Sequence, residues 1–188
     1  MERELRERLI GSRRAFEGRL ISVQVDEVEL SDGTRTAREV VSHPGAVAVV
    51  PMLEGGRVVM IRQYRHAAGR VLWELPAGTL GEGEAPEECA RRELAEEVGY
   101  EAGMLRPLFS TYLSPGYSKE LIHVFVAREL RETSARTEAD ERIEAAQLSL
   151  EEAVAMIGRG EVQNAAAICG LLAVARWWHG KEEAGRRD

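Results

Sequence analysis

The chain has 188 residues, 44% of them hydrophobic, which suits one domain with a real core and a small appendage. A net charge of −7 argues against binding along a nucleic-acid backbone, which needs clustered Lys and Arg. The two cysteines suggest no disulfide framework and fit a reducing compartment. The N-terminus lacks an apolar signal sequence, and the most apolar window, 165–178, is too short to span a bilayer. We therefore expect a cytoplasmic protein.

The N-terminal part of the chain has a pattern of its own. Residues 1–18 are highly charged with a thin apolar stripe, so we expect them to be frayed or supported by a partner. Hydrophobic residues then alternate over 20–30, a turn follows at 31–34, and residues 38–41 resume the pattern. This predicts a β-hairpin. Because an isolated hairpin is marginal in water, it must pack on the main body or on a second subunit.

Strands dominate the middle of the chain and helices its end. Two apolar runs, 46–53 and 58–64, flank a Glu-Gly-Gly turn and predict a second hairpin. The first run is apolar on both faces and is therefore expected to be central in a sheet. Further strands are expected at 71–75, 105–113, 121–126 and about 143–148. Helices are expected from Ser149, as N-cap, to about Ile157, and from about Gln163 to His179. Strands with helices on both sides of a mixed sheet predict an α/β/α sandwich.

The stretch from Gly78 to Tyr100 reads GTLGEGEAPEECARRELAEEVGY and joins a glycine-rich acidic loop to a helix. Pro86 suits the first helical turn, where its missing N–H costs nothing. Gly99 stands where a left-handed residue ends a helix.

Three glutamates, Glu93, Glu96 and Glu97, share an arc of about 100° on this predicted helix. Like charges at this spacing repel. A hard divalent cation such as Mg²⁺ removes the repulsion, because it takes oxygen ligands and commonly bridges carboxylates to phosphates. The alternative is a solvated acidic face with neighbouring arginines as counter-ions.

The wider spacing supports the metal interpretation. The stretch fits G-x5-E-x7-R-E-U-x-E-E-x-G-U, with Gly78, Glu84, Arg92, Glu93, Leu94, Glu96, Glu97, Gly99 and Tyr100 in the named places. It resembles the box of the Nudix hydrolases, which cleave a nucleoside diphosphate linked to another moiety. Tyr100 replaces the usual aliphatic residue, which affects packing and leaves the chemistry unchanged.

The resemblance covers about 45–175 and implies a fold and a domain organisation. The fold is an α/β Nudix-type α/β/α sandwich with a mixed β-sheet and an N-terminal β-hairpin appendage. Residues 1–43 would form the charged segment and the hairpin, which in such relatives reaches across a dimer. Residues 44–180 would form the Nudix hydrolase domain, and 181–188 a polar tail.

The same resemblance assigns the metal site. Glu93 and Glu97 are expected to be ligands, Glu96 a ligand directly or through water, and the backbone carbonyl of Ala77 a further one. Arg92 is expected to orient the carboxylates. Mg²⁺ is the expected cofactor, and Mn²⁺ or another divalent ion also fits.

The residues outside the box point to a substrate. Pro115 stands sixteen residues after Gly99 within SPGYSKE, and QYR at 63–65 precedes ELPAG at 74–78. With REVV at 38–41, these blocks resemble the ADP-ribose pyrophosphatases, which convert ADP-ribose to AMP and ribose 5-phosphate. The expected substrate-binding residues are Arg65, Arg38, Glu74, Pro115 and Gly116. The alternatives are an ordinary Ser-Pro-Gly turn, a salt bridge from Arg65 to an acidic neighbour, and a bracing role for Glu74.

In these relatives the general base often comes from a loop well after the box, and here the acidic segment 137–141 has that position. Glu141 is the first candidate and Glu138 the second. If the loop is inert, the base is Glu96 or Glu97. The four histidines show no metal-ligand spacing and receive no role.

The sequence thus predicts an enzyme that hydrolyses ADP-ribose with a divalent ion. The alternatives are a pyrophosphatase for another nucleoside diphosphate sugar and a non-catalytic Nudix sensor that binds nucleotide sugars. The expected partners are a small nucleoside diphosphate sugar and a second copy of the chain, with no nucleic acid and no membrane.

Overall fold

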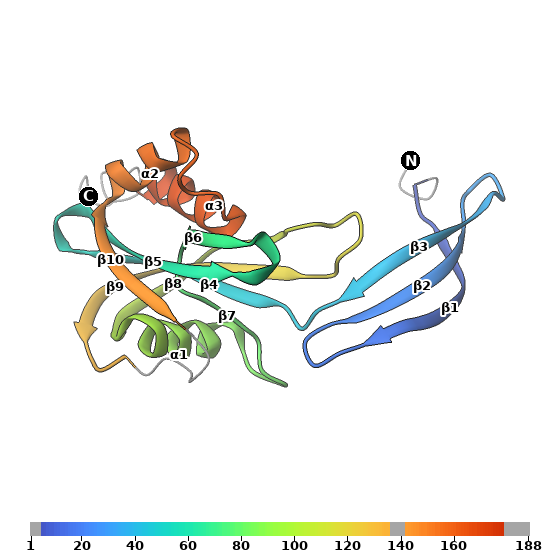
Figure 1. The fold of residues 1–188 in the computed structure, drawn as a ribbon, viewed down its shortest axis with the longest axis horizontal. Helices are drawn as coiled ribbons and strands as arrows, with labels where there is room; N and C mark the ends of the chain where they lie inside the picture. Colours follow the sequence, from blue (N-terminus) through green and yellow to red (C-terminus); the bar gives the residue numbers. More distant parts are fainter. Residues whose placement is uncertain (1–4, 136–141, 179–188) are drawn as a thin grey trace, which may run out of the picture. The chain divides into compact units, whose positions relative to one another are not determined.

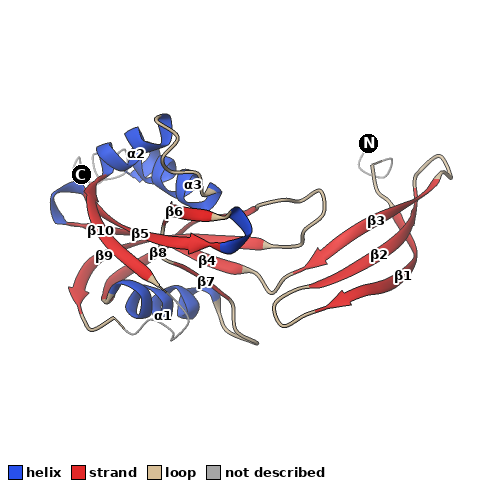
Figure 2. Ribbon diagram, in the orientation of Figure 1, coloured by secondary structure: helices blue, strands red, loops and turns tan. Residues whose placement is uncertain are grey.

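The computed structural model describes residues 5–135 and 142–178 (Figures 1 and 2). The strands are β1 (Arg8–Glu17), β2 (Ser22–Glu29), β3 (Arg35–Ser42), β4 (Ala46–Leu53), β5 (Arg57–Arg65), β6 (Arg70–Glu74), β7 (Ala77–Thr79), β8 (Tyr100–Tyr112), β9 (Leu121–Glu132) and β10 (Ile143–Ser149). The α-helices are α1 (Pro86–Val98), α2 (Leu150–Gly158) and α3 (Ala165–Ala173). The chain divides into two compact units, Met1–Gly45 with Tyr112–Leu121, and Ala46–Thr111 with Ile122–Asp188.

The first unit is an antiparallel sheet in the order β1-β2-β3. The predicted hairpin is confirmed as β2 and β3, which pair from Ser22↔Ser42 to Glu29↔Arg35. Its turn is closed by the N–H of Leu30, which donates to the carbonyl of Thr34 at 2.8 Å.

Residues 1–18 were expected to be frayed or supported by a partner. The frayed alternative is wrong for residues 8–17, which form β1. This strand pairs with β2 along its length, and Arg8 adds an ion pair to Glu29 at 2.6 Å. Most of its side chains are exposed. A strand held by backbone pairing, with little apolar alternation, leaves little sequence signal to read.

The segment with Pro115 belongs to the first unit and is tied to β3. The N–H of Val41 donates to the carbonyl of Tyr117 at 2.7 Å, and the N–H of Lys119 donates to the carbonyl of Val41 at 2.9 Å. The carbonyl of Ser114 accepts from the N–H of Tyr117 at 3.1 Å. Pro115 and Gly116 therefore occupy the centre of a turn, as the alternative interpretation of this segment expects.

The second unit contains a mixed sheet in the order β10-β5-β4-β9-β8, with β6 beside β5 and β7 beside β4. β4 is parallel to β9 and antiparallel to β5 and β7. Residues 46–52 of β4 are all buried. The prediction of a central, covered strand is confirmed.

Helices cover both faces of this sheet (Figure 2). Successive residues of β4 point to opposite faces. Val47 and Val49 pack in one hydrophobic cluster with Leu94 of α1. Val50 packs in a second cluster with Leu171 of α3. The predicted α/β/α sandwich is confirmed, and α1 lies alone on one of its faces among the helices that the structure describes (Figure 1).

The helix ends follow the predicted signals. Gly99 takes φ 69° and its N–H donates to the carbonyls of Ala95 and Leu94, so it closes α1 as expected. The hydroxyl of Ser149 accepts from the N–H of Glu152 at 3.0 Å at the start of α2. The last helix begins at Ala165, capped by Asn164, and continues in a π-helical turn, η4 (Val174–Trp178). In the described part of the chain no helix is long and apolar enough to cross a bilayer.

The three-residue strand β7 was expected to be loop. It forms because its backbone pairs with β4, with Val47 opposite Gly78 and Ala48 opposite Ala77. A strand this short has no alternation of its own. Its position beside β4 brings the start of the Nudix-like box against α1.

Candidate active site

The carboxylate of Glu93 lies directly over Gly78 of β7. A β-carbon at position 78 would stand 1.9 Å from Oε1 of Glu93 and 2.0 Å from its Cδ. Real contacts are never this short, so only glycine fits here while Glu93 keeps its place. Gly78 therefore has a specific structural role, which is to leave room for a carboxylate.

Glu97 is hydrogen-bonded to the first residue of the same short strand. Its Oε2 accepts a hydrogen bond from the N–H of Ala77 at 2.9 Å, and the residue is only 5% exposed. A buried carboxylate is costly unless it is hydrogen-bonded. This bond ties the last turn of α1 to β7.

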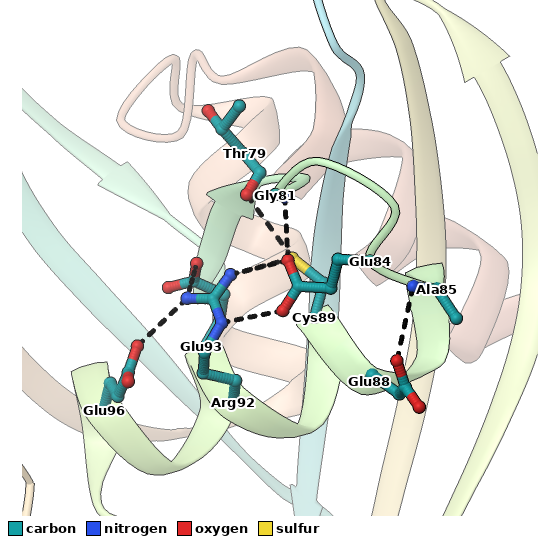
Figure 3. A network of polar contacts seen from close by, with 9 residues as sticks. All are labelled: Thr79, Gly81, Glu84, Ala85, Glu88, Cys89, Arg92, Glu93 and Glu96. Atoms are coloured by element: carbon teal, nitrogen blue, oxygen red, sulfur yellow. Dashed lines mark hydrogen bonds and ion pairs between the residues drawn. The ribbon is translucent and has the colours of Figure 1, made fainter.

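Arg92 lies at the centre of the acidic cluster (Figure 3). Its Nε and Nη2 donate to the two carboxylate oxygens of Glu84 at 2.8 and 3.0 Å, a bidentate fork. Its Nη1 donates to Oε1 of Glu93 at 2.6 Å and to Oε2 of Glu96 at 3.0 Å. One guanidinium thus holds three carboxylates, which is the geometry that the predicted orienting role requires.

The charges of this network shift the pKa values of its members. Hydrogen bonds from Arg92 and from the N–H of Gly81 lower the pKa of Glu84 to about 2. The hydrogen bond to Glu84 in turn raises the pKa of Arg92 above its ordinary value. Both groups therefore stay ionised at neutral pH, and the bond from Gly81 to Glu84, 2.8 Å long, fixes the loop before α1.

Cys89 also takes part in this network, although the sequence alone assigns it no role in the site. Its Sγ accepts from Nη2 of Arg92 at 3.3 Å and donates to the carbonyl of Thr79 at 3.6 Å (Figure 3). Burial raises the pKa of the thiol to about 12, so it remains protonated. Cys89 links β7 to the arginine, and its place three residues before Arg92 on a helix is the signal that was available.

The cluster fits a divalent cation in its chemistry. Within the described ranges, no three His, Cys, Asp or Glu side chains are grouped closely enough to hold a metal ion. Arg92 is hydrogen-bonded to both Glu93 and Glu96. The donors are nevertheless hard carboxylate oxygens on one helix face, of the kind that Mg²⁺ prefers. The bare glycine at position 78 leaves room for the Glu93 carboxylate beside β7. The predicted ligands Ala77, Glu93, Glu96 and Glu97 are thus brought to one place.

Arg65 and Glu74, both expected at the substrate, form an ion pair. Nε of Arg65 donates to Oε1 of Glu74 at 3.0 Å, and Nη2 donates to Oε2 at 2.7 Å. Glu74 is 2% exposed, whereas the side chain of Arg65 is 42% exposed. The salt bridge foreseen as the alternative is present, and substrate contact by the exposed arginine stays a prediction.

The remaining predicted residues belong to the first unit or lie outside the described residues. Arg38, in the first unit with Pro115 and Gly116, forms an ion pair with Glu7 at 2.6 Å, and this contact raises its pKa. Glu138 and Glu141 lie outside the described residues.

Family models divide the chain in two. Residues 7–41 match the nucleoside diphosphate sugar hydrolase N-terminal domain. Residues 42–169, more than half of the chain, match the NUDIX domain. The chain belongs to the Nudix family.

Similar proteins support this membership. The Nudix chain is 40% identical over 165 residues to the ADP-ribose pyrophosphatase of Bacillus subtilis (strain 168), covering 87% of this chain and 89% of the relative. It is 42% identical over 171 residues to the ADP-ribose pyrophosphatase of Mycobacterium tuberculosis (strain ATCC 25618 / H37Rv), covering 88% and 81%. A solved structure described as "Crystal structure of ADP compounds hydrolase" shares the fold, with a TM-score of 0.84, 24% identity, and 94% and 96% of the two chains covered.

The resemblance to Nudix hydrolases is therefore confirmed, and the protein is a Nudix hydrolase. Nudix hydrolases generally need a divalent metal ion, and the glutamate cluster on α1 has the donor chemistry for one.

Proposed function

We propose that this Nudix hydrolase cleaves the pyrophosphate bond of ADP-ribose to give AMP and ribose 5-phosphate. The observation that carries the proposal is the 40% and 42% identity to two ADP-ribose pyrophosphatases over more than four fifths of the chain. The acidic cluster between β7 and α1 supports it, because diphosphate hydrolysis needs charge neutralisation and an activated water.

Mg²⁺ is the metal we propose, with Mn²⁺ as a substitute that the same oxygen donors accept. Glu93, Glu96, Glu97 and the carbonyl of Ala77 would hold it. When bound, it supplies positive charge at the diphosphate and lowers the pKa of water. Arg92 orients Glu93 and Glu96 by its bonds of 2.6 and 3.0 Å, and the N–H of Ala77 fixes Glu97.

Water is the nucleophile in this proposal. Its oxygen forms a bond to one phosphorus, the bond from that phosphorus to the bridging oxygen breaks, and a carboxylate accepts the proton that the water loses. Glu141 is our first candidate for the base and Glu138 the second, both in the acidic segment after β9. Glu96 or Glu97 takes this role if neither does. Replacing the true base by Gln should lower kcat by about 10²–10⁴.

The substrate contacts and the assembly are further parts of the proposal. Arg65, Arg38, Glu74, Pro115 and Gly116 would bind the nucleoside diphosphate sugar. Residues 1–43 would take part in forming a homodimer. Residues 44–180 would form the hydrolase domain, and residues 181–188 a polar tail. Exposed apolar side chains on β1, such as those of Leu9 and Phe16, favour a second copy as cover for the first unit. A solution mass near twice 20.9 kDa by light scattering would support the dimer, and a monomer mass would exclude it.

A substrate panel tests the activity. ADP-ribose, ADP-glucose and GDP-mannose are compared by kcat/KM with and without Mg²⁺. We expect ADP-ribose to give the highest value, with release of AMP that stops when the metal is chelated. Hydrolysis of another substrate without AMP release from ADP-ribose would overturn the substrate assignment.

A second candidate is hydrolysis of another nucleoside diphosphate sugar. The match of residues 7–41 to the nucleoside diphosphate sugar hydrolase N-terminal domain favours this broader class. The same panel decides between them. A cytoplasmic location completes the proposal, since Cys89 and Cys169 form no disulfide, which suits a reducing compartment.

A further inference from the structure

Ser110 of β8 and His123 of β9 form a polar pair within the second unit. The hydroxyl oxygen of Ser110 lies 2.8 Å from Nδ1 of the imidazole, across the two neighbouring strands. The spacing of the four histidines indicates no metal site, so the sequence alone assigns His123 no role. Its position in the sheet, however, places it near the acidic cluster.

His123 belongs to the same row of the sheet as Gly78. Val47 of β4 is paired with Gly78 of β7 on one side and with His123 of β9 on the other. Directly paired residues of neighbouring strands point to the same face. Val47 packs in the cluster with Leu94 of α1, so the imidazole is on the α1 face of the sheet. Two strand spacings put it about 10 Å from Gly78, over which the Glu93 carboxylate lies.

Exposure varies along this row: Gly78 is half-buried and Val47, next to it, is fully buried. Glu93 covers Gly78, and Val47 is 0% exposed. His123 is half-buried and Ser110 is exposed. On the side of Val47 that faces away from Gly78, the row thus becomes accessible to solvent again at His123. A nucleoside diphosphate sugar whose diphosphate binds at Glu93 is long enough to reach a side chain about 10 Å away.

The ring has one nitrogen engaged and one available. Nδ1 is hydrogen-bonded to Ser110, and no residue that the structure describes is bonded to Nε2. A neutral imidazole has one donor and one acceptor nitrogen. If the Ser110 hydroxyl donates to Nδ1, the proton of the ring is on Nε2, which then points a donor at an oxygen-rich ligand.

We propose that His123 is a substrate-positioning residue, which donates from Nε2 to a phosphate or ribose oxygen of the nucleoside diphosphate sugar. Ser110 fixes the tautomer that makes this bond. The inference rests on the proposed function and adds a residue that recognises the part of the substrate beside the reacting phosphorus. The bond acts on substrate binding, so it affects KM and leaves kcat largely unchanged.

Two variants separate this role from packing. The amide nitrogen of Gln reaches the place of Nε2, whereas that of Asn reaches only the place of Nδ1. His123→Asn should raise KM for ADP-ribose about tenfold or more at nearly unchanged kcat, the effect of a lost hydrogen bond to a charged or polar group. His123→Gln should restore most of the affinity. Ser110→Ala should raise KM by a smaller factor, since the ring is then free to take the other tautomer.

The melting temperature of each variant is measured beside the kinetics. A KM in His123→Asn equal to that of the wild type overturns the inference. So does an equal rise in His123→Asn and His123→Gln accompanied by equal losses of thermal stability, since the ring would then be structural. If the wild-type protein hydrolyses no nucleoside diphosphate sugar, the proposed function itself fails. If the wild type is active and the KM of His123→Asn equals that of the wild type, the proposed function stands. Only the role proposed for His123 is then excluded.

Discussion

The carboxylate of Glu93 fills the space that a side chain at position 78 would occupy. A β-carbon on Gly78 would meet Oε1 of Glu93 at 1.9 Å. The close approach is created by two separate elements, the edge strand β7 and the helix α1 that packs on the same face of β4. The first glycine of the box is thus a requirement of the acidic cluster and not only of a turn.

Gly78→Ala should disable the cluster. The added methyl group forces Glu93 or β7 to move, and overpacking of this kind costs about 1–3 kcal/mol of unfolding free energy. We expect kcat to fall by about tenfold or more, because a displaced catalytic carboxylate is poorly positioned. Thermal unfolding and Mg²⁺-dependent turnover measure both effects. Gly158→Ala is the control, since no described heavy atom lies within 4 Å of its added β-carbon. Wild-type turnover in Gly78→Ala would contradict the role given to Glu93.

Glu97→Gln should remove a charge and keep a hydrogen bond. The amide oxygen of Gln still accepts from the N–H of Ala77, which now bonds Oε2 at 2.9 Å. We expect the unfolding free energy to stay within about 1 kcal/mol of the wild type. Loss of an anionic metal ligand should lower kcat by about 10²-fold or more. The matched control is Glu101→Gln, an exposed glutamate on β8, which should alter neither quantity. Unchanged turnover in Glu97→Gln would refute the metal site.

Acid should remove the contribution of Glu84 to stability. Its pKa is lowered from 4.5 to about 2 in the folded protein, chiefly by Arg92. A lowered folded-state pKa stabilises the fold fully above pH 4.5 and progressively less as the pH falls towards 2. The difference in unfolding free energy between the wild type and Glu84→Gln should therefore shrink from pH 6 to about pH 3. Denaturant titrations over this range measure it, and a constant difference would show that Arg92 does not stabilise the ionised form.

Much of the fold follows from local patterns. β4 is apolar on both faces and is central, and α1 carries its own start and stop residues, Pro86 and Gly99. Elements without such signals were not predicted. β7 exists because β4 pairs with it, and β1 because β2 does. Strands of this kind depend on the tertiary structure, and a single sequence does not display their partners.

In the site, too, some features follow from local sequence patterns and others depend on the tertiary structure. The helical arc brings Glu93, Glu96 and Glu97 to one region, as the spacing predicts. The arc alone did not indicate that Arg92 would bind Glu93, Glu96 and Glu84 together, because that depends on how the loop before α1 folds back. The row that joins Gly78 to His123 depends on strand register. Register is a property of the assembled sheet.

Tyr100→Phe tests whether the unusual residue of the box affects packing alone. Its hydroxyl accepts from Nε2 of Gln147 at 3.0 Å, and Oε1 of Gln147 accepts from Nη1 of Arg57 at 2.7 Å. Loss of the hydroxyl should cost about 1 kcal/mol of unfolding free energy. KM and kcat should not change. Tyr64→Phe, at an exposed tyrosine of β5, is the control and should leave stability as it was. A large drop in kcat for Tyr100→Phe would assign this residue to the chemistry.

Substitutions of Arg65 and Glu74 test whether Arg65 contacts the substrate or only forms the salt bridge with Glu74. Arg65→Ala leaves the carboxylate of Glu74, 2% exposed, without this partner. We expect a loss of about 2–3 kcal/mol, below the range for fully buried pairs because the arginine side chain is 42% exposed. Glu74→Gln removes the buried charge and should make the same arginine substitution cheaper, which a double-mutant cycle of unfolding free energies detects.

The kinetics of the same cycle separate the two roles. If Arg65 binds a phosphate or ribose oxygen, Arg65→Ala raises KM by about tenfold or more whether residue 74 is Glu or Gln. If the arginine only braces Glu74, its effect on KM disappears in the Glu74→Gln background, since nothing remains to be braced. We expect the first result, because the guanidinium is partly exposed and its partner is not. Arg62→Ala, on the same strand, is the control for a lost surface arginine: its ion pair with Glu144 is exposed and its loss should leave KM unchanged.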